Sequence, residues 1–164
     1  MSNINPPLTR VRIISDYQFG QGAGCALFSD NVEFQMSSTG RVRQILFEGK
    51  RVATVKAHDG MLTLGIEGAM RLHNFLKFPG NRVVVNSDSA PFVAKGKNAF
   101  AKHVVGSDPD IRAGEEVMVV DEEDNVLATG KAVLCAIEMT AFKKGMAVEV
   151  RSGIKTGDIA HKIE

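Results

Sequence analysis

Residues 88–103 read Asp-Ser-Ala-Pro-Phe-Val-Ala-Lys-Gly-Lys-Asn-Ala-Phe-Ala-Lys-His, and they follow the β-branched run Val83-Val84-Val85. The valines predict a strand. The next residues predict a short helix over about 88–95, capped near Ser87 or Asp88. Gly96 predicts the end of that helix, and a strand with lysines on it comes next. This order of strand, short helix, glycine turn and basic strand decides the fold that we expect.

The rest of the second half is rich in short strands, which we expect at 82–86, 100–105, 116–120, 126–136 and 146–151. Residues 121–125 form an acidic hairpin turn between two of them. These short strands at close spacing, interrupted by one helix, indicate a small β-barrel. We expect a short polar tail at 154–164 that is loosely held.

The first half has a different organisation. The alternation in Leu8–Ser15 predicts a strand, and the glycine-rich residues 17–28 predict a turn that leads into a helix. Further strands are expected at 32–36, 41–47, 51–57 and 61–64. Ile66, Ala69, Met70, His73 and Leu76 follow helical spacing and predict an amphipathic helix over 66–76. Phe78-Pro79-Gly80 ends that helix, so we place a domain boundary there.

The net charge is only +1, but the charges are segregated along the chain. Basic residues gather in 41–56 and again in 95–103, whereas 108–124 carries eight carboxylates against a single arginine, Arg112. A segregated charge distribution allows local phosphate binding even though the totals cancel. Solvated faces and turns explain any one of these clusters equally well.

The sequence matches known catalytic and metal-binding motifs only poorly. Gly20-Gln-Gly22-Ala-Gly24 lacks the third glycine of a dinucleotide loop at the required spacing, and no glycine precedes Gly96-Lys97 or Gly130-Lys131 as in a phosphate-binding loop. The histidines His58, His73, His103 and His161, and the cysteines Cys25 and Cys135, have no zinc-ligand spacing. We therefore expect no metal and no cofactor. His58-Asp59 is an acid–base pair in one interpretation and a turn before Gly60 in the other.

No apolar run approaches the ~18 residues of a membrane helix, and the first residues lack the apolar core of a signal peptide. The sequence therefore predicts a cytoplasmic protein without a membrane partner. Its two cysteines are free thiols in one interpretation and a single disulfide in the other.

Several further motifs, in order, resemble the C-terminal region of archaeosine tRNA-guanine transglycosylases, in which a PUA domain forms the last part. They are Asp16-Tyr-Gln-Phe-Gly20, Thr39-Gly-Arg-Val-Arg-Gln44, Ala57-x-Asp59-Gly60, Ile66-Glu-Gly-Ala69-x-Arg71-Leu-His73, Arg82-Val-Val-Val-Asn86 and Gly114-x-Glu116-Val. The resemblance covers about residues 8–153. It implies an α+β module at 8–78 followed by a PUA-type β-barrel at 79–153.

The resemblance also implies a binding site. In PUA domains the helix after the first strand and the glycine turn after it face the RNA, and Gly-x-Asn brings the backbone close to it. Carried over by position, this nominates Ser89, Pro91, Lys95, Gly96, Lys97, Asn98 and Lys102 as RNA-binding residues, with Arg82 and Arg151 added to the same face. The family's catalytic (β/α)₈ barrel needs ~250 residues, so the resemblance implies tRNA handling without base exchange.

The sequence leaves three hypotheses. The first is a tRNA-binding protein, either stand-alone or the RNA-binding subunit of a transglycosylase-type enzyme. The second is an enzyme with a site at His58-Asp59 or at the Gly20–Gly24 loop. The third is a protein-binding scaffold that has lost RNA binding, in keeping with the nearly neutral total charge.

Overall fold

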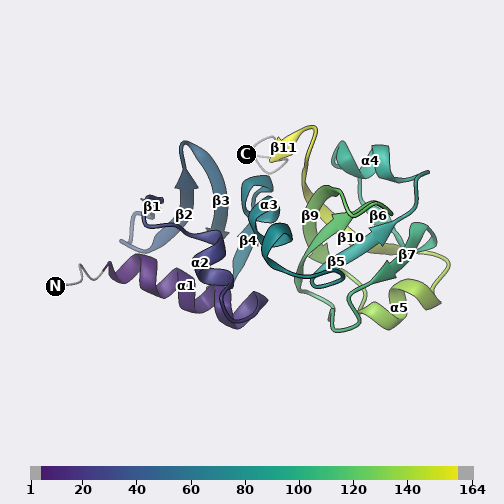
Figure 1. Ribbon diagram of the computed structural model, residues 1–164, viewed down its shortest axis with the longest axis horizontal. Helices are drawn as coiled ribbons and strands as arrows, with labels where there is room; N and C mark the ends of the chain where they lie inside the picture. The colour runs from purple at the N-terminus through teal and green to yellow at the C-terminus, as the bar shows by residue number, and fades with distance from the viewer. Residues whose placement is uncertain (1–4, 159–164) are drawn as a thin grey trace. The chain divides into compact units, whose positions relative to one another are not determined.

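The computed structural model describes residues 5–158, and Figure 1 shows its helices and strands. The chain divides into two compact units, residues 1–75 and 76–164, each with its own sheet. The division falls at residue 75, within the predicted helix, whereas the sequence predicts a boundary after residue 78.

The first unit opens with α1 (Pro6–Phe19), so the predicted strand at 8–15 is wrong. The Asn5 side chain caps this helix by accepting a hydrogen bond from the Leu8 amide at 3.3 Å, and prolines occupy its first turn. Proline is favoured there because the first helical amides have no partner within the helix. The buried residues Leu8, Val11, Ser15 and Phe19 lie three or four positions apart, which is helical spacing.

The glycine-rich segment serves the packing of two helices. A short helix, α2 (Ala23–Leu27), packs against α1, and Gly24 lies directly on the backbone of Arg12, where a Cβ atom has no room. The Asp16 carboxylate accepts a hydrogen bond from the Gly24 amide at 2.7 Å. Helix packing therefore explains Gly24, and positive φ angles of +116° and +94° at the end of α1 and the start of α2 explain Gly20 and Gly22, so no nucleotide site is needed to account for these glycines.

The sheet of the first unit is an antiparallel meander in the order β1-β2-β3-β4. Its strands are β1 (Glu33–Met36), β2 (Val42–Phe47), β3 (Lys50–Val55) and β4 (Leu62–Leu64). The predicted strands at these positions agree with the structure to within a few residues at each end.

The helix α3 (Ile66–Phe75) packs on this sheet through its small residues. Gly68 lies against the backbone of Val52, too close for a Cβ atom, and the buried positions are Gly68, Ala69 and Leu72. The predicted apolar stripe is thus rotated, since Met70 is 40% exposed and His73 is only half-buried.

The second unit is built on a sheet in the order β11-β10-β9-β8-β5-β7, with β6 paired to β10. The strands are β5 (Arg82–Val85), β6 (Ala99–Phe100), β7 (Val104–Ser107), β8 (Glu116–Val120), β9 (Val126–Ala132), β10 (Met146–Gly153) and β11 (Gly157–Asp158). A 3₁₀ turn, η1 (Ala101–His103), joins β6 to β7, so one segment pairs with β10 at its start and with β5 at its end. This double pairing nearly closes the sheet into the predicted barrel.

Valines from several strands fill the barrel. Every residue of β5 and β8 is buried, and Val83, Val85, Val117, Val119 and Val148 meet in one apolar cluster. The predicted helix at 88–95 is α4 (Ala90–Ala94). The sequence did not predict a second helix in this unit, α5 (Ala136–Ala141). The strand expected at 126–136 is too long, because β9 ends at Ala132 and the chain then enters α5.

The predicted tail is partly structured. Gly157 pairs with Gly153, and the Ile154 amide donates to the Leu127 carbonyl at 2.8 Å. The chain to residue 158 is therefore attached to the barrel. Residues 159–164 of the predicted tail, with His161, lie outside the described residues.

Candidate nucleic-acid interface

The loop after α4 contains most of the predicted RNA-binding residues. The Lys95 and Lys97 amides both donate to the Phe92 carbonyl, at 3.1 and 3.0 Å, so the chain turns tightly at the helix end. Gly96, between them, has φ +98°, a conformation that side chains with a Cβ atom rarely adopt. The side chains of both lysines are exposed.

Two of the predicted residues help to hold this loop. The Asn98 side-chain oxygen accepts a hydrogen bond from the Val150 amide at 2.9 Å, beside the irregularity in the pairing of β10 with β9. Gly153 packs so closely on the loop that a Cβ atom there would lie 2.7 Å from the Gly96 nitrogen. Asn98 and Gly96 therefore fix the loop against β10, and the lysines beside them are carried by a firm backbone.

A second group of lysines lies around η1. Lys102, Lys143 and Lys144 line a hollow of about 250 Å³ together with Phe100 and Gly145. The Ala101 amide donates to the Gly145 carbonyl at 2.9 Å, which ties the turn before β10 to η1. Within residues 5–158, none of these three lysines forms an ion pair.

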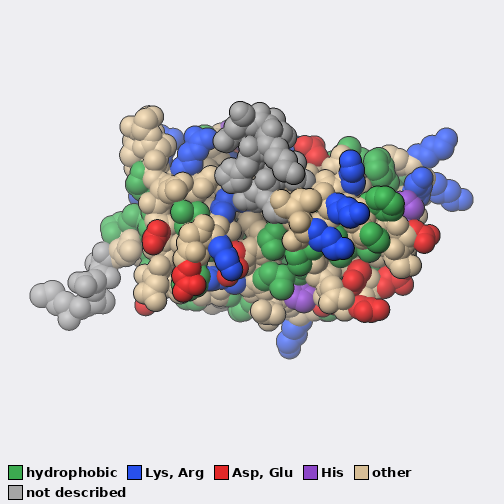
Figure 2. Space-filling model, turned by 90° about the horizontal axis from the view of Figure 1, so that it is seen from above, with side chains coloured by type: hydrophobic (Ala, Val, Ile, Leu, Met, Phe, Trp, Pro, Cys, Tyr) green, Lys and Arg blue, Asp and Glu red, His purple; other side chains and the backbone are tan. Residues whose placement is uncertain are grey.

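Exposed phenylalanines stand among these lysines. Phe92 is 59% exposed, Phe100 43% and Phe142 46%. Lys and Arg side chains gather at the right-hand edge of Figure 2, the edge where Figure 1 draws the loop after α4 and the turn before β10. Free cations beside exposed aromatic rings are typical of surfaces that bind single-stranded nucleic acid, because the cations contact phosphates while the rings stack on bases.

Sequence reasoning missed Lys143, Lys144 and the phenylalanines. The signal was present as Phe142-Lys143-Lys144-Gly145, an aromatic residue and two cations before a turn glycine. We call the lysines of both groups and the exposed phenylalanines among them the basic face; its members are Phe92, Lys95, Lys97, Phe100, Lys102, Phe142, Lys143 and Lys144.

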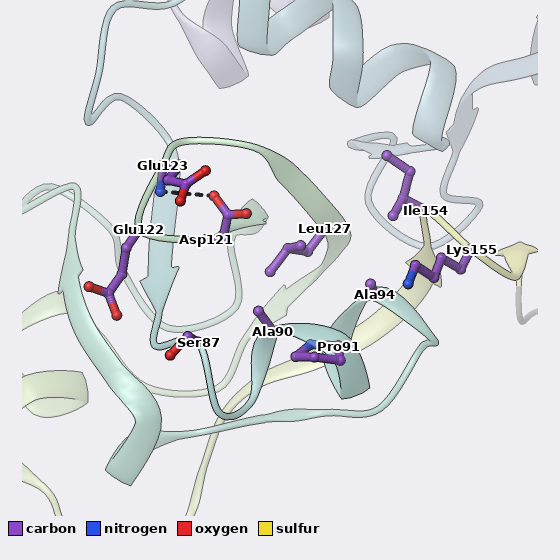
Figure 3. Close-up of a pocket in the computed structure, with 10 residues that line it drawn as sticks. All are labelled: Ser87, Ala90, Pro91, Ala94, Asp121, Glu122, Glu123, Leu127, Ile154 and Lys155. Atoms are coloured by element: carbon purple, nitrogen blue, oxygen red, sulfur yellow. Dashed lines mark hydrogen bonds between the residues drawn. The ribbon is translucent and has the colours of Figure 1, made fainter.

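Ser89 and Pro91 do not belong to the basic face. Ser89 is only 7% exposed and stands at the start of α4. Pro91 lines a separate groove of about 280 Å³, drawn in Figure 3, whose lining includes no residue of the basic face. That groove has an apolar floor with Ala90, Ala94 and Leu127. The carboxylates at one end, of Asp121, Glu122 and Glu123, repel phosphate, whereas Lys155 stands at the other end.

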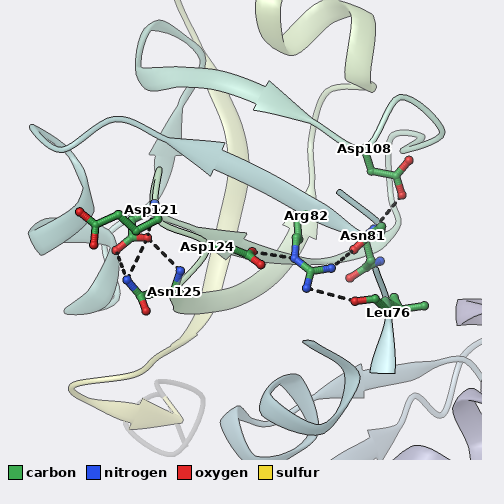
Figure 4. Close-up of polar contacts among 9 residues, drawn as sticks. Leu76, Asn81, Arg82, Asp108, Asp121, Asp124 and Asn125 are labelled. Atoms are coloured by element: carbon green, nitrogen blue, oxygen red, sulfur yellow. Dashed lines mark hydrogen bonds and ion pairs between the residues drawn. The ribbon is translucent and has the colours of Figure 1, made fainter. Parts of the chain in front are cut away.

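Arg82 is buried, contrary to the expectation that it adds to an exposed basic face. Its side chain is 2% exposed and bonds Asp124 at 2.7 Å, as Figure 4 shows. The same guanidinium donates to the carbonyls of Gly80 at 2.9 Å and Leu76 at 3.2 Å. Its charge is therefore used to join the start of β5 to the acidic hairpin, and it is not available to phosphate.

Arg151 is committed in a similar way. It forms a two-pronged pair with Glu116, with N–O distances of 2.7 and 2.9 Å, and the Glu116 side chain is 4% exposed. A carboxylate buried to this extent needs a paired cation. Of the predicted cations, the structure thus leaves Lys95, Lys97 and Lys102 free and uses both arginines within the barrel.

The His58-Asp59 pair of the enzyme hypothesis lies in an exposed turn. Asp59 accepts a hydrogen bond from the Met61 amide at 2.9 Å, which is the main reason that its pKa is lowered, and it contacts Lys56 at 3.2 Å. The His58 side chain is 88% exposed and 3.6 Å from Asp59. This is the arrangement of a turn-forming aspartate.

Two kinds of feature are absent from the described residues. No cluster of three metal-binding side chains occurs between residues 5 and 158. Over the same range, no helix has the length and apolar character required to cross a membrane.

The fold and the basic face together define a protein with a PUA barrel. Residues 81–154 match the PUA domain, and residues 9–79 match the patch-forming domain C2 of tRNA-guanine transglycosylase. The chain therefore carries a C2 domain followed by a PUA domain, in the order that the sequence motifs indicated.

Curated relatives place these two domains within a larger protein. The chain is 49% identical over 147 residues to the tRNA-guanine(15) transglycosylase of Methanothermobacter thermautotrophicus, and 52% identical over 145 residues to that of Pyrococcus furiosus. These alignments cover 89% and 88% of this chain but 22% and 24% of the relatives. The chain thus spans about a quarter of the length of the curated relatives that it matches.

Solved structures support the fold over most of the chain. A hypothetical protein from Pyrococcus horikoshii superposes with a TM-score of 0.73 at 20% identity, covering 96% of this chain and 94% of that chain. A conserved PUA domain protein from Thermoplasma acidophilum has a TM-score of 0.61 at 22% identity, covering 87% of each. At these identities the likeness is one of fold.

Proposed function

We propose that this protein binds tRNA through the basic face of its PUA barrel. The main observation behind the proposal is that unpaired lysines lie beside exposed phenylalanines on a loop and a turn that backbone hydrogen bonds hold in place. Lysine contacts to phosphate provide affinity without reading sequence, and aromatic rings add stacking on unpaired bases. We propose tRNA as the RNA because the curated relatives are named tRNA-guanine(15) transglycosylases.

The same proposal gives the chain a place in tRNA modification. The base-exchange reaction named for its relatives is assigned to a separate transglycosylase-type subunit, and this chain holds the tRNA for it. The chain matches about a quarter of those relatives, in the region that carries the C2 and PUA domain matches, and this supports the division. We assign the complex to the cytoplasm, where tRNA is modified.

The two other hypotheses have less support. The enzyme hypothesis rests on His58 and Asp59, which form an exposed turn. The scaffold hypothesis rests on the small net charge of +1, but the acids lie in other segments and leave the lysines of the basic face unpaired.

The test is a binding assay with purified full-length protein and total tRNA. Binding should be measurable at low salt and should weaken steeply as salt rises, because phosphate contacts release counterions. An unstructured acidic polymer of similar charge serves as the competitor control. Absence of tRNA binding at low salt contradicts the proposal, and so does equal competition by the polymer.

A further inference from the structure

The groove beside α4, drawn in Figure 3, has no part in the tRNA-binding proposal. Its floor is apolar. Ala90 and Ala94 lie four positions apart on α4 and therefore on one side of the helix, with Pro91 beside them, and Leu127 of β9 completes the floor. A floor of this kind accepts apolar side chains, because the contact removes apolar surface of both partners from water.

The acidic end of the groove offers carboxylates without partners. Asp121 accepts hydrogen bonds from the Glu123 and Asn125 amides, both at 2.9 Å, and thereby sets the turn between β8 and β9. The Glu122 and Glu123 side chains are exposed, and neither forms an ion pair within residues 5–158. Two free carboxylates on a fixed turn attract a cation and repel phosphate.

The opposite end combines an apolar side chain with one cation. Ile154 is 42% exposed, and its amide donates to the Leu127 carbonyl at 2.8 Å. The Lys155 amide donates to the Ala94 carbonyl at 2.9 Å, so this end is attached both to β9 and to α4. Three carboxylates against one ammonium group give the whole groove a formal charge of −2.

These features favour a polypeptide over RNA as the occupant. The charge of the groove repels a phosphate backbone. None of the described residues that line the groove is aromatic, so a nucleobase finds no ring to stack on. A lysine or arginine close to large apolar side chains matches the groove instead, because the cation meets the free carboxylates while the apolar side chains cover the floor.

We propose that this groove docks an extended segment of a partner protein in which a lysine or arginine lies within a few residues of large apolar side chains. The cation pairs with Glu122 and Glu123, and the apolar side chains lie between α4 and Ile154. Extended segments are commonly bound in this way, with pockets and charges selecting their side chains. The inference goes beyond tRNA binding, and a docked segment leaves the basic face exposed because the groove shares no residue with it.

The test uses ¹⁵N-labelled full-length protein and three short peptides with blocked ends. The first peptide has two arginines followed by two leucines, the second has glutamates in place of the arginines, and the third has serines in place of the leucines. The first should shift the backbone amide signals of Ala90, Leu127 and Ile154. It should bind at least about tenfold more tightly than either of the others, since each of those lacks one half of the match.

Two double variants test the acidic end. Glu122→Gln with Glu123→Gln removes the proposed partners of the cation, and Asp110→Asn with Glu149→Gln removes two exposed carboxylates of the same unit outside the groove. The first variant should bind the arginine–leucine peptide about fivefold more weakly, because exposed ion pairs contribute modestly. The control should stay within about twofold of the unaltered protein, since its charges act only through the screened general field. Equal binding by the two variants overturns the proposal.

A third variant, Ile154→Ser, tests the floor and separates a protein partner from RNA. The side chain is exposed, so the fold should persist, and the peptide should bind about fivefold more weakly because less apolar surface is buried. The tRNA affinity should stay the same. Weaker tRNA binding by this variant would assign the groove to RNA and overturn the inference, with the proposed function intact.

The peptide experiment does not depend on the proposed function. If the unaltered protein fails to bind tRNA, the proposed function fails, and the peptides still decide the role of the groove. If none of the three peptides shifts the amide signals of the groove, or if all three bind equally, the inference is overturned.

Discussion

The barrel carries two kinds of cation that look alike in the sequence and differ in the fold. Lys102, Lys143 and Lys144 are exposed, without ion pairs, around a shallow hollow. Arg82 and Arg151 are paired with Asp124 and Glu116 and hold distant parts of the barrel together. Charge on the chain therefore shows where phosphate binding is possible, whereas the fold decides which charges are left to perform it.

The largest effect is expected at Arg82. Arg82→Ala should lower the free energy of unfolding by about 3 kcal/mol, because it removes a buried ion pair and leaves two backbone carbonyls without their donor. The measurement is urea unfolding followed by circular dichroism, with Arg112→Ala as an exposed control that should change stability by less than about 0.5 kcal/mol.

The same variant separates stability from binding. The tRNA affinity of the folded Arg82→Ala protein should be unchanged, since the guanidinium contacts only the protein. A folded variant with normal stability and weakened tRNA binding would mean that Arg82 is a phosphate contact after all.

The next effect is expected at the lysines around η1. Replacement of Lys102, Lys143 and Lys144 together by alanine should lower tRNA affinity about 50-fold near physiological salt, since three phosphate contacts each contribute through counterion release. Stability should hardly change, because exposed charges away from special features contribute within about 0.5 kcal/mol. Fluorescence anisotropy with labelled tRNA measures the affinity.

The matched control for that variant removes three exposed cations elsewhere on the barrel unit, Lys77, Arg112 and Lys131. Equal losses in the two triple variants would indicate a diffuse attraction with no defined basic face.

A smaller effect is expected at Phe100, which lines the same hollow and is 43% exposed. Phe100→Ala should weaken tRNA binding by about fivefold, since one stacked base contributes about 1 kcal/mol or more. The salt slope should stay the same, because no charge is removed. If the variant instead bound tRNA normally at low salt but showed a different salt slope, Phe100 would help to shape the lysine hollow and would not stack on a base.

The elements that sequence predicted well have strong local signals. The strand at Val83–Val85, the glycine turn at Gly96 and the acidic hairpin are all where the sequence placed them. The error at Leu8–Ser15 came from reading alternation and passing over Asn5 and the two prolines, which begin a helix. Local capping was the stronger signal there.

The packing surfaces were harder to predict. α3 faces its sheet with Gly68 and Ala69, because close contact with the Val52 backbone demands small side chains. A search for large apolar residues at helical spacing therefore chose the wrong side and put Met70 inside.

The candidate site depended on contacts over long sequence distances. Arg82 and Asp124 are 42 positions apart, and Asn98 and Val150 are 52 apart. The sequence around each residue does not show that Asp124 neutralises the charge of Arg82, or that the bond between Asn98 and Val150 fixes a loop. The residues that the resemblance nominated therefore divide into exposed lysines, internal supports and one proline on another groove.

The most direct test of the account is the salt dependence of tRNA binding by the full-length protein and by the variant lacking Lys102, Lys143 and Lys144. The logarithm of the affinity should fall linearly with the logarithm of the salt concentration, and loss of the three lysines should reduce the slope by about 2. Parallel lines for the two proteins would contradict the assignment of the basic face as the tRNA-binding surface.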